Sequence, residues 1–106
     1  MIEEMDRPWG HWVTHLDFPG RAKVKTLVVH PNEQLSIQRH FHRNETWYLL
    51  HGKGTVYMEG IWHQLYAITH INQGVWHSLM NTGTEDLVVL EVQWGVRCEE
   101  SDIERK

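Results

Sequence analysis

Short runs in which apolar and polar residues alternate dominate this chain, and apolar positions at helical spacing are scarce. Alternation with a period of two is typical of β-strands that bury one face. Strands are predicted over residues 23–29, 35–41, 46–50, 55–58, 64–71, 77–80 and 87–94. Glu59-Gly60 directly follows one of these runs and predicts a hairpin turn. About eight short strands separated by turns predict an all-β fold, either an antiparallel sandwich or a barrel.

The size and charge of the chain limit the kind of protein it can be. Its 106 residues, 41% of them hydrophobic, fit a single domain with one core. We expect this domain to span 1–106, with an N-terminal arm at 1–9 and a charged tail at 99–106 that is frayed or forms a helical turn. The net charge of -4, without a run of like charges, argues against nucleic acid or an anionic membrane as the main partner.

Two further features predict a cytoplasmic protein. No stretch approaches the ~20 apolar residues that span a bilayer, and the acidic residues 1–6 resemble neither a signal peptide nor a transit peptide. Cys98 is the only cysteine, so no internal disulfide is expected and a reducing compartment is indicated. The neighbouring Glu99 and Glu100 are expected to raise the pKa of this thiol, which argues against a catalytic thiolate.

Gln38, His40, Glu45 and His77 form a candidate metal site. Gln38 and His40 lie two apart in a predicted strand and therefore project to the same side. A hairpin after His40 would bring Glu45 back beside it, and the turn at Gly74 would let His77 point inward from a distant strand. Nitrogen and oxygen donors of this kind suit one divalent ion, and zinc, iron, manganese, cobalt and nickel all remain open.

The spacing of these residues resembles the two cupin motifs. The first corresponds to Asn32, five residues, Gln38-x-His40, four residues, Glu45, six residues and Gly52, and the second to Asn72-x-Gly74-x-x-His77-x-x-x-Asn81. Gln38 replaces the usual first histidine, Asn32 the usual glycine, and Asn72 a common proline. The resemblance implies a single small cupin barrel, a double-stranded β-helix or jelly roll, with the metal inside. The implied ligands are Gln38, His40, Glu45 and His77.

A finer resemblance runs nearly end to end. The chain is similar to the C-terminal domain of type II mannose-6-phosphate isomerases, which is often fused to a mannose-1-phosphate guanylyltransferase. The segments that carry this resemblance are Arg7-Pro8-Trp9-Gly10, residues 35–47, Leu90-Glu91-Val92-Gln93 and residues 100–105. The chain departs from the family pattern at two positions. Phe41 interrupts what is often a run of three histidines, and Ser101 replaces an acidic residue. The 106 residues leave no room for a nucleotidyltransferase domain, so we do not expect guanylyl transfer from them.

The resemblance implies a metal-dependent isomerase that interconverts mannose 6-phosphate and fructose 6-phosphate. A similar glutamine, histidine, glutamate and histidine set in type I isomerases makes zinc the expected ion. His42 is the candidate general base, or else a further metal ligand, and Glu91 is the weaker candidate base. Arg43 is the candidate phosphate ligand at the rim of the site. The expected partners are a sugar phosphate and a second copy of the chain, since one sheet face needs cover.

Other functions fit the same residues. An iron centre with the same ligands would suit an oxygenase, and a non-enzymatic module would bind a sugar or sugar phosphate. A metal-free sugar epimerase is a third alternative, but it leaves the spacing of Glu45 and His77 unexplained. Lys23 and Lys25 are expected to be exposed strand residues, and Arg105 a solvated tail residue.

Overall fold

The computed structural model describes residues 3–106, which form an all-β molecule without a helix in that range. The strands are β1 (Glu3–Arg7), β2 (Gly10–Phe18), β3 (Ala22–Val29), β4 (Gln38–Arg39), β5 (Arg43–His51), β6 (Gly54–Met58), β7 (Ile61–Gln64), β8 (Ile68–Ile71), β9 (His77–Asn81), β10 (Leu87–Gly95) and β11 (Glu104–Arg105). All their pairings are antiparallel.

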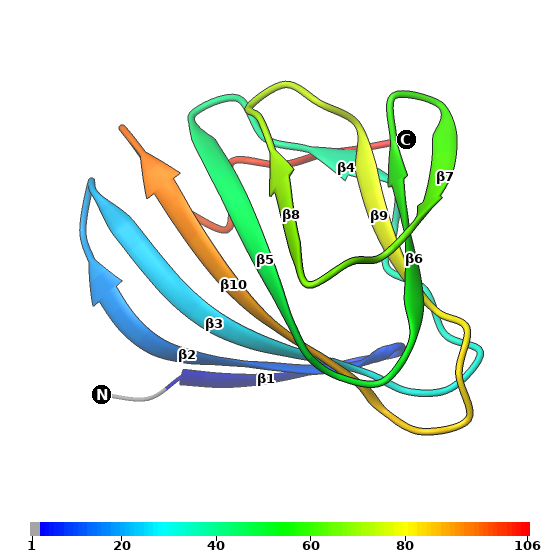
Figure 1. Cartoon of the computed structure of the whole chain (residues 1–106). Coiled ribbons are helices and arrows are strands. Elements are labelled where there is room, and N and C mark those ends of the chain that lie inside the picture. The colour runs from blue at the N-terminus through cyan, green and yellow to red at the C-terminus, as the bar shows by residue number, and fades with distance from the viewer. Residues whose placement is uncertain (1–2) are drawn as a thin grey trace.

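Two sheets form a jelly roll, which confirms the predicted fold class. The larger sheet has the strand order β1-β2-β3-β10-β5-β8, and the smaller has the order β11-β4-β9-β6-β7. Neighbours in each sheet are often distant in sequence, as when β10 lies between β3 and β5 (Figure 1). The chain therefore crosses repeatedly from one sheet to the other and encloses a core between them.

Alternation explains which side chains enter that core. In β3 and β10 every second residue is buried, which places Leu27, Val29, Leu87 and Val89 between the sheets. Leu79 of β9 meets them from the smaller sheet. The same alternation also turns polar side chains inward, because positions near one end of these strands are not apolar. The interior is therefore a hydrophobic core at one end and a polar cavity at the other.

Several predicted strands differ from the structure. The run 35–41 contributes only the two residues of β4, because the amides of Phe41 and His42 bond to the Asp102 carboxylate instead of continuing a ladder. The run 64–71 is interrupted between β7 and β8, where Leu65 donates to the Gly54 carbonyl. The hairpin turn at Glu59-Gly60 is confirmed, since Met58 pairs with Ile61 and both turn residues have positive φ.

The two ends of the chain are more ordered than the sequence suggested. Within the predicted arm, Glu3–Arg7 form β1, which pairs with β2, whereas residues 1 and 2 lie outside the described residues. The predicted helical or frayed tail is wrong. Glu104–Arg105 form β11 beside β4, and the Lys106 amide donates to the Ile37 carbonyl. The tail is therefore fixed to the loop that carries His40.

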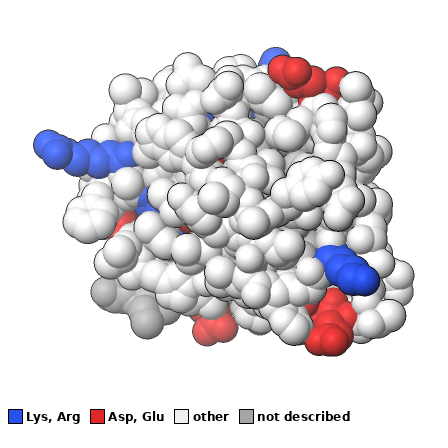
Figure 2. All heavy atoms as spheres, in the orientation of Figure 1, with Lys and Arg blue, Asp and Glu red and all other residues white. Residues whose placement is uncertain are grey.

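Charged side chains are few on one face of the molecule. On the face shown in Figure 2, lysine, arginine, aspartate and glutamate lie mostly at the edges, and the two signs are mixed. No extended patch of one sign is visible on this face. Among residues 3–106 there is also no helix with the length and apolar character needed to cross a membrane.

Candidate metal centre

A cavity of about 450 Å³ lies at the polar end of the interior. Its walls come from β2, β3, β5 and β10 of the larger sheet, from β4 and β9 of the smaller sheet, and from the two ends of the chain. His40, Glu45 and His77 line it together, and all three are at least nine-tenths buried. The cavity therefore brings together three of the four residues that the sequence nominated as metal ligands, with Gln38 also in its wall.

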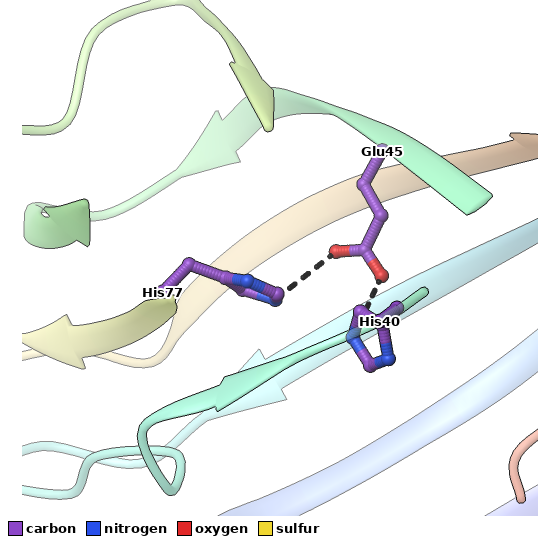
Figure 3. A group of neighbouring side chains, drawn as sticks. All are labelled: His40, Glu45 and His77. Atoms are coloured by element: carbon purple, nitrogen blue, oxygen red, sulfur yellow. Dashed lines mark ion pairs between the residues drawn. The ribbon is translucent and has the colours of Figure 1, made fainter. Parts of the chain in front are cut away.

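The three side chains converge on one point (Figure 3). Glu45 lies between the two imidazoles, with Oε2 3.3 Å from His40 Nε2 and Oε1 3.6 Å from His77 Nε2. One ligand atom from each residue lies within 4.8 Å of the others. The pairing of Gln38 in β4 with His77 in β9 brings the two histidines close together, because it places His40 and His77 on neighbouring stretches of chain. The geometry fits a small cation.

Each histidine is held in the tautomer that a metal requires. His40 Nδ1 is 2.7 Å from the Asp102 carbonyl oxygen, and His77 Nδ1 is 2.9 Å from the Val75 carbonyl oxygen. Since a carbonyl only accepts, each Nδ1 carries a proton, and each ring turns its Nε2, the atom that could bind a metal, toward the Glu45 carboxylate. A backbone acceptor behind the ring is the usual support of a metal-bound histidine.

The electrostatics of the cluster favour a bound cation. Burial lowers the pKa of His40 to about 4, with Arg43 acting in the same direction, so this imidazole is neutral near pH 7. Burial alone would raise the pKa of Glu45, but His77 and Arg43 outweigh it and hold the pKa of the carboxyl below its ordinary value. Glu45 Oε1 is buried and has no hydrogen-bond donor among residues 3–106. A buried carboxylate oxygen without a donor is costly, and a cation between it and His77 would remove that cost.

Gln38 is placed differently from the other three. It lines the cavity from β4 and is partly exposed, and its Nε2 donates to the carbonyl and hydroxyl oxygens of Ser36 at 3.2 and 3.3 Å. Its role as a fourth ligand stays a prediction.

Glu91 is a buried carboxylate in the wall next to this cluster. Trp47 Nε1 donates to its Oε2 at 3.0 Å, and Gln93 Nε2 donates to its Oε1 at 2.6 Å. Burial and the neighbouring Glu45 carboxylate raise the pKa of Glu91 above its usual range. Two carboxyls in one cavity are therefore distinguished, with Glu45 ionised and Glu91 closer to neutral.

The other two nominated residues do not occupy the expected positions. His42 is absent from the cavity wall, its side chain is 44% exposed, and its Nδ1 lies 3.2 Å from Asp102 Oδ1. Arg43 lies inside rather than at the rim. It donates to Glu45 Oε2 from Nε at 3.1 Å, and its Nη2 is 3.2 Å from His40 Nε2. His42 thus lies outside the cavity wall and its role as a base stays a prediction, whereas Arg43 is engaged in orienting the ligands.

Several residues in the cavity wall were not identified from the sequence. Lys25 is only 2% exposed, although it was expected at the surface, and Trp12 and Arg7 lie near it in the wall. The alternation of β3 could have predicted the burial of Lys25. Lys25 lies two and four residues before Leu27 and Val29, so its side chain points to the same side of the strand as these core residues. Arg105, expected to be a solvated tail residue, also lines the cavity.

A two-sheet jelly roll in which two histidines and a glutamate meet between the sheets defines a cupin. In agreement, a cupin-2 domain from Rhodospirillum rubrum superposes with a TM-score of 0.77 at 15% identity, over 95% of this chain and 78% of that one. The chain belongs to the mannose-6-phosphate isomerase C-terminal family, whose model matches residues 1–106.

Two curated relatives are longer proteins. The chain is 38% identical over 102 residues to a mannose-1-phosphate guanylyltransferase of Sinorhizobium fredii, covering 93% of this chain and 20% of that protein. It is 36% identical over 108 residues to the alginate biosynthesis protein AlgA of Pseudomonas aeruginosa, covering 96% of this chain and 21% of that protein. The chain therefore spans about a fifth of the length of these relatives.

Proposed function

We propose that this cupin is a metal-dependent sugar-phosphate isomerase that interconverts mannose 6-phosphate and fructose 6-phosphate. The observation that carries the proposal is the placement of two unlike carboxyls in one cavity. Glu45, whose pKa is lowered, lies between the Nε2 atoms of His40 and His77, and Glu91 lies next to it with a raised pKa. The first arrangement suits a metal ligand and the second suits a proton carrier. Membership of the mannose-6-phosphate isomerase C-terminal family supports this assignment.

His40, Glu45 and His77 would hold the ion, with Gln38 available as a fourth ligand from β4. A divalent ion held there supplies Lewis acidity, which polarises the sugar carbonyl and makes the neighbouring C–H more acidic. Arg43 keeps the Glu45 carboxylate ionised and oriented through its hydrogen bond to Oε2. The Asp102 and Val75 carbonyls keep both imidazoles pointed inward.

Isomerisation moves a proton between C1 and C2 of the sugar, and Glu91 is the residue proposed to carry it. Its carboxylate accepts hydrogen bonds from Trp47 and Gln93, which fix its position in the wall. A raised pKa lets one group take the proton from one carbon and return it to the other at neutral pH. Such a group typically contributes about 10²–10⁴-fold in rate.

The direct test is an assay of conversion of mannose 6-phosphate to fructose 6-phosphate, with and without a chelator. We expect turnover that is lost on chelation, restored by zinc or another divalent ion, and absent in His77→Ala. A matched control is His63→Ala, which removes an exposed histidine of β7 outside the cavity wall. Saturable binding of mannose 6-phosphate without turnover in any metal-loaded form would instead identify a sugar-phosphate binding module.

A further inference from the structure

Two lysines of β3 are buried on the inner side of the larger sheet. Lys23 is 7% exposed and Lys25 is 2% exposed, and they alternate with outward-facing neighbours. An ammonium group is expensive to bury unless an anion lies against it. Lys25 also lines the cavity that contains Glu45 and Glu91, so its charge faces the space that a substrate would occupy.

One carboxylate from the C-terminal segment contacts both ammonium groups. Glu100 Oε1 lies 2.5 Å from Lys25 Nζ and 3.7 Å from Lys23 Nζ. The Glu100 side chain is 40% exposed and projects from an irregular stretch before β11, so solvent reaches it. Glu91, which pairs with Lys25 across the β3–β10 ladder, instead accepts hydrogen bonds from Trp47 and Gln93. The main anion at Lys25 is therefore a side chain at the edge of the cavity.

Arg7 and Trp12 add further hydrogen-bond donors to the cavity that Lys25 lines. The guanidinium of Arg7 lies 4.6 Å from the centre of the Trp12 ring, and Lys25 Nζ lies 4.2 Å from it. Trp12 is 93% buried and lines the cavity, yet its Nε1–H has no acceptor within the described part of the chain. A buried indole N–H normally has an acceptor. Two cations, each against the Trp12 ring, and an unsatisfied donor on that ring therefore line the cavity together.

We propose that Lys25, Arg7 and Trp12 form the subsite for the phosphate group of the substrate, with the Glu100 carboxylate as an internal anion that phosphate displaces. The identity of the ligand as a sugar phosphate rests on the proposed function. The exchange breaks the Lys25–Glu100 ion pair and forms charge-assisted hydrogen bonds from Lys25 and Arg7 to phosphate oxygens. Glu100 then turns to solvent, which its exposed position allows.

The distance from the metal centre suits a phosphorylated sugar. β10 separates β3, which carries Lys25, from β5, which carries Glu45. Lys25 is level with Glu91 on β10 and Trp47 on β5, and Glu45 lies two residues further along β5. With ~4.8 Å between neighbouring strands and ~3.4 Å per residue along a strand, Lys25 and Glu45 are based roughly 12 Å from each other. A hexose phosphate can therefore place its phosphate at Lys25 while its carbonyl end lies toward Glu45, with Glu91 on the strand between them.

Calorimetric titration with inorganic phosphate tests the subsite without depending on turnover. We expect Glu100→Gln to bind phosphate about tenfold more tightly than the wild type, and Lys25→Gln to bind it at least about tenfold more weakly, shifts of about 1.4 kcal/mol each. Glu99→Gln is the matched control, because it removes an adjacent carboxylate whose backbone carbonyl, not its side chain, contacts Arg43. It should leave phosphate affinity unchanged.

Opposite effects of the two main variants are the distinguishing result, because a purely structural ion pair would not make phosphate bind more tightly when Glu100 is neutralised. If Lys25→Gln does not fold, Arg7→Gln replaces it, since Arg7 lies on the exposed strand β1. Unchanged phosphate affinity in Glu100→Gln and in Arg7→Gln would overturn the subsite. Phosphate binding with the expected pattern but no isomerase activity would reject the proposed reaction and keep the subsite.

Discussion

The carbonyl oxygen of Asp102 accepts a hydrogen bond from His40 Nδ1 at 2.7 Å, although 62 residues separate them in the chain. The carboxylate of the same residue accepts the amides of Phe41 and His42 at 3.0 and 2.9 Å. Asp102 therefore fixes both the loop that carries His40 and the orientation of its ring. The C-terminal segment is part of the support of the metal centre.

This contact predicts a pH-dependent contribution to stability. Burial would raise the pKa of Asp102, but the amides of Phe41 and His42 outweigh it and lower the pKa below its ordinary value. A depressed folded pKa stabilises the protein above the unfolded pKa of about 3.9, and this stability is lost as pH falls through the folded value. We expect Asp102→Asn to lower the free energy of unfolding by about 2 kcal/mol at pH 6.

The gap between the wild type and Asp102→Asn should narrow as the pH falls below the unfolded pKa of about 3.9, and close as the pH falls through the lower pKa of the folded carboxyl. Urea unfolding followed by circular dichroism over pH 3–7 measures both curves. Asp6→Asn is the control, because Asp6 is an exposed residue of β1. A gap that stays constant across this range would mean that the Asp102 charge does not hold the loop.

Gly10 is expected to tolerate no side chain. Its φ is 151°, and a Cβ atom there would lie 1.9 Å from the carbonyl oxygen of Val28 on the neighbouring strand. Gly10→Ala must therefore displace β2 from β3, and we expect it to lower the free energy of unfolding by about 3 kcal/mol. Gly60→Ala is the matched control, since Gly60 also has positive φ but a Cβ atom there would meet only Tyr57 Oη, at 4.0 Å. It should cost about 1 kcal/mol, and equal costs would contradict the account.

Glu91 is expected to affect turnover without affecting the metal. Glu91→Gln keeps the shape of the side chain and removes its ability to take a proton, so turnover should fall about 10²–10⁴-fold. Metal affinity, measured by competition with a chromophoric chelator, should stay within about twofold, a change of about 0.4 kcal/mol. The exposed Glu85 provides a control through Glu85→Gln. Parallel loss of metal and turnover would place Glu91 among the ligands instead.

The outer face of the larger sheet predicts self-association. One row across five strands consists of Val13, Thr26, Leu90, Tyr48 and Ile68, none of which is charged. Tyr48 is 38% exposed and Ile68 is 57% exposed. Because an uncharged face can meet its own copy without like-charge repulsion, we expect a homodimer through this surface.

Sedimentation equilibrium of Tyr48→Lys checks this expectation. The variant should be a monomer at concentrations where the wild type is a dimer, because the change buries an ammonium group in the interface. Ile61→Lys, on β7 of the smaller sheet, is the control and should remain a dimer. A monomeric wild type would show that this face has another partner or none.

The strand pattern and the metal triad were accessible from the sequence for a physical reason. Alternation reports one buried face, and the spacing of the two motifs singled out His40, Glu45 and His77, which the structure brings together. His42 was expected on the same side as His40, but the alternation of side-chain direction along a strand does not continue through an irregular loop. The chain leaves the strand geometry at His40, and parity restarts at Arg43, which shares the inner face with Glu45.

The tail illustrates a second limit. Residues 99–106 have no apolar alternation that would predict a strand, and their order comes from contacts across the molecule. Glu100 bonds to Lys25, Asp102 to His40, and Glu104 to Arg39. Each partner lies far away in sequence, so no local pattern reports the contact. The burial of Lys25 contradicts the expectation of an exposed residue, but its parity with the core residue Leu27 would have predicted it.

The most direct test of the central claim is anomalous diffraction at the absorption edge of a divalent ion, from crystals of the metal-loaded protein. The account predicts one ion per chain between the sheets, bonded to His40 Nε2, His77 Nε2 and a Glu45 oxygen at about 2.0–2.2 Å. An ion found only at surface histidines, with nothing bound between His40, Glu45 and His77, would contradict it.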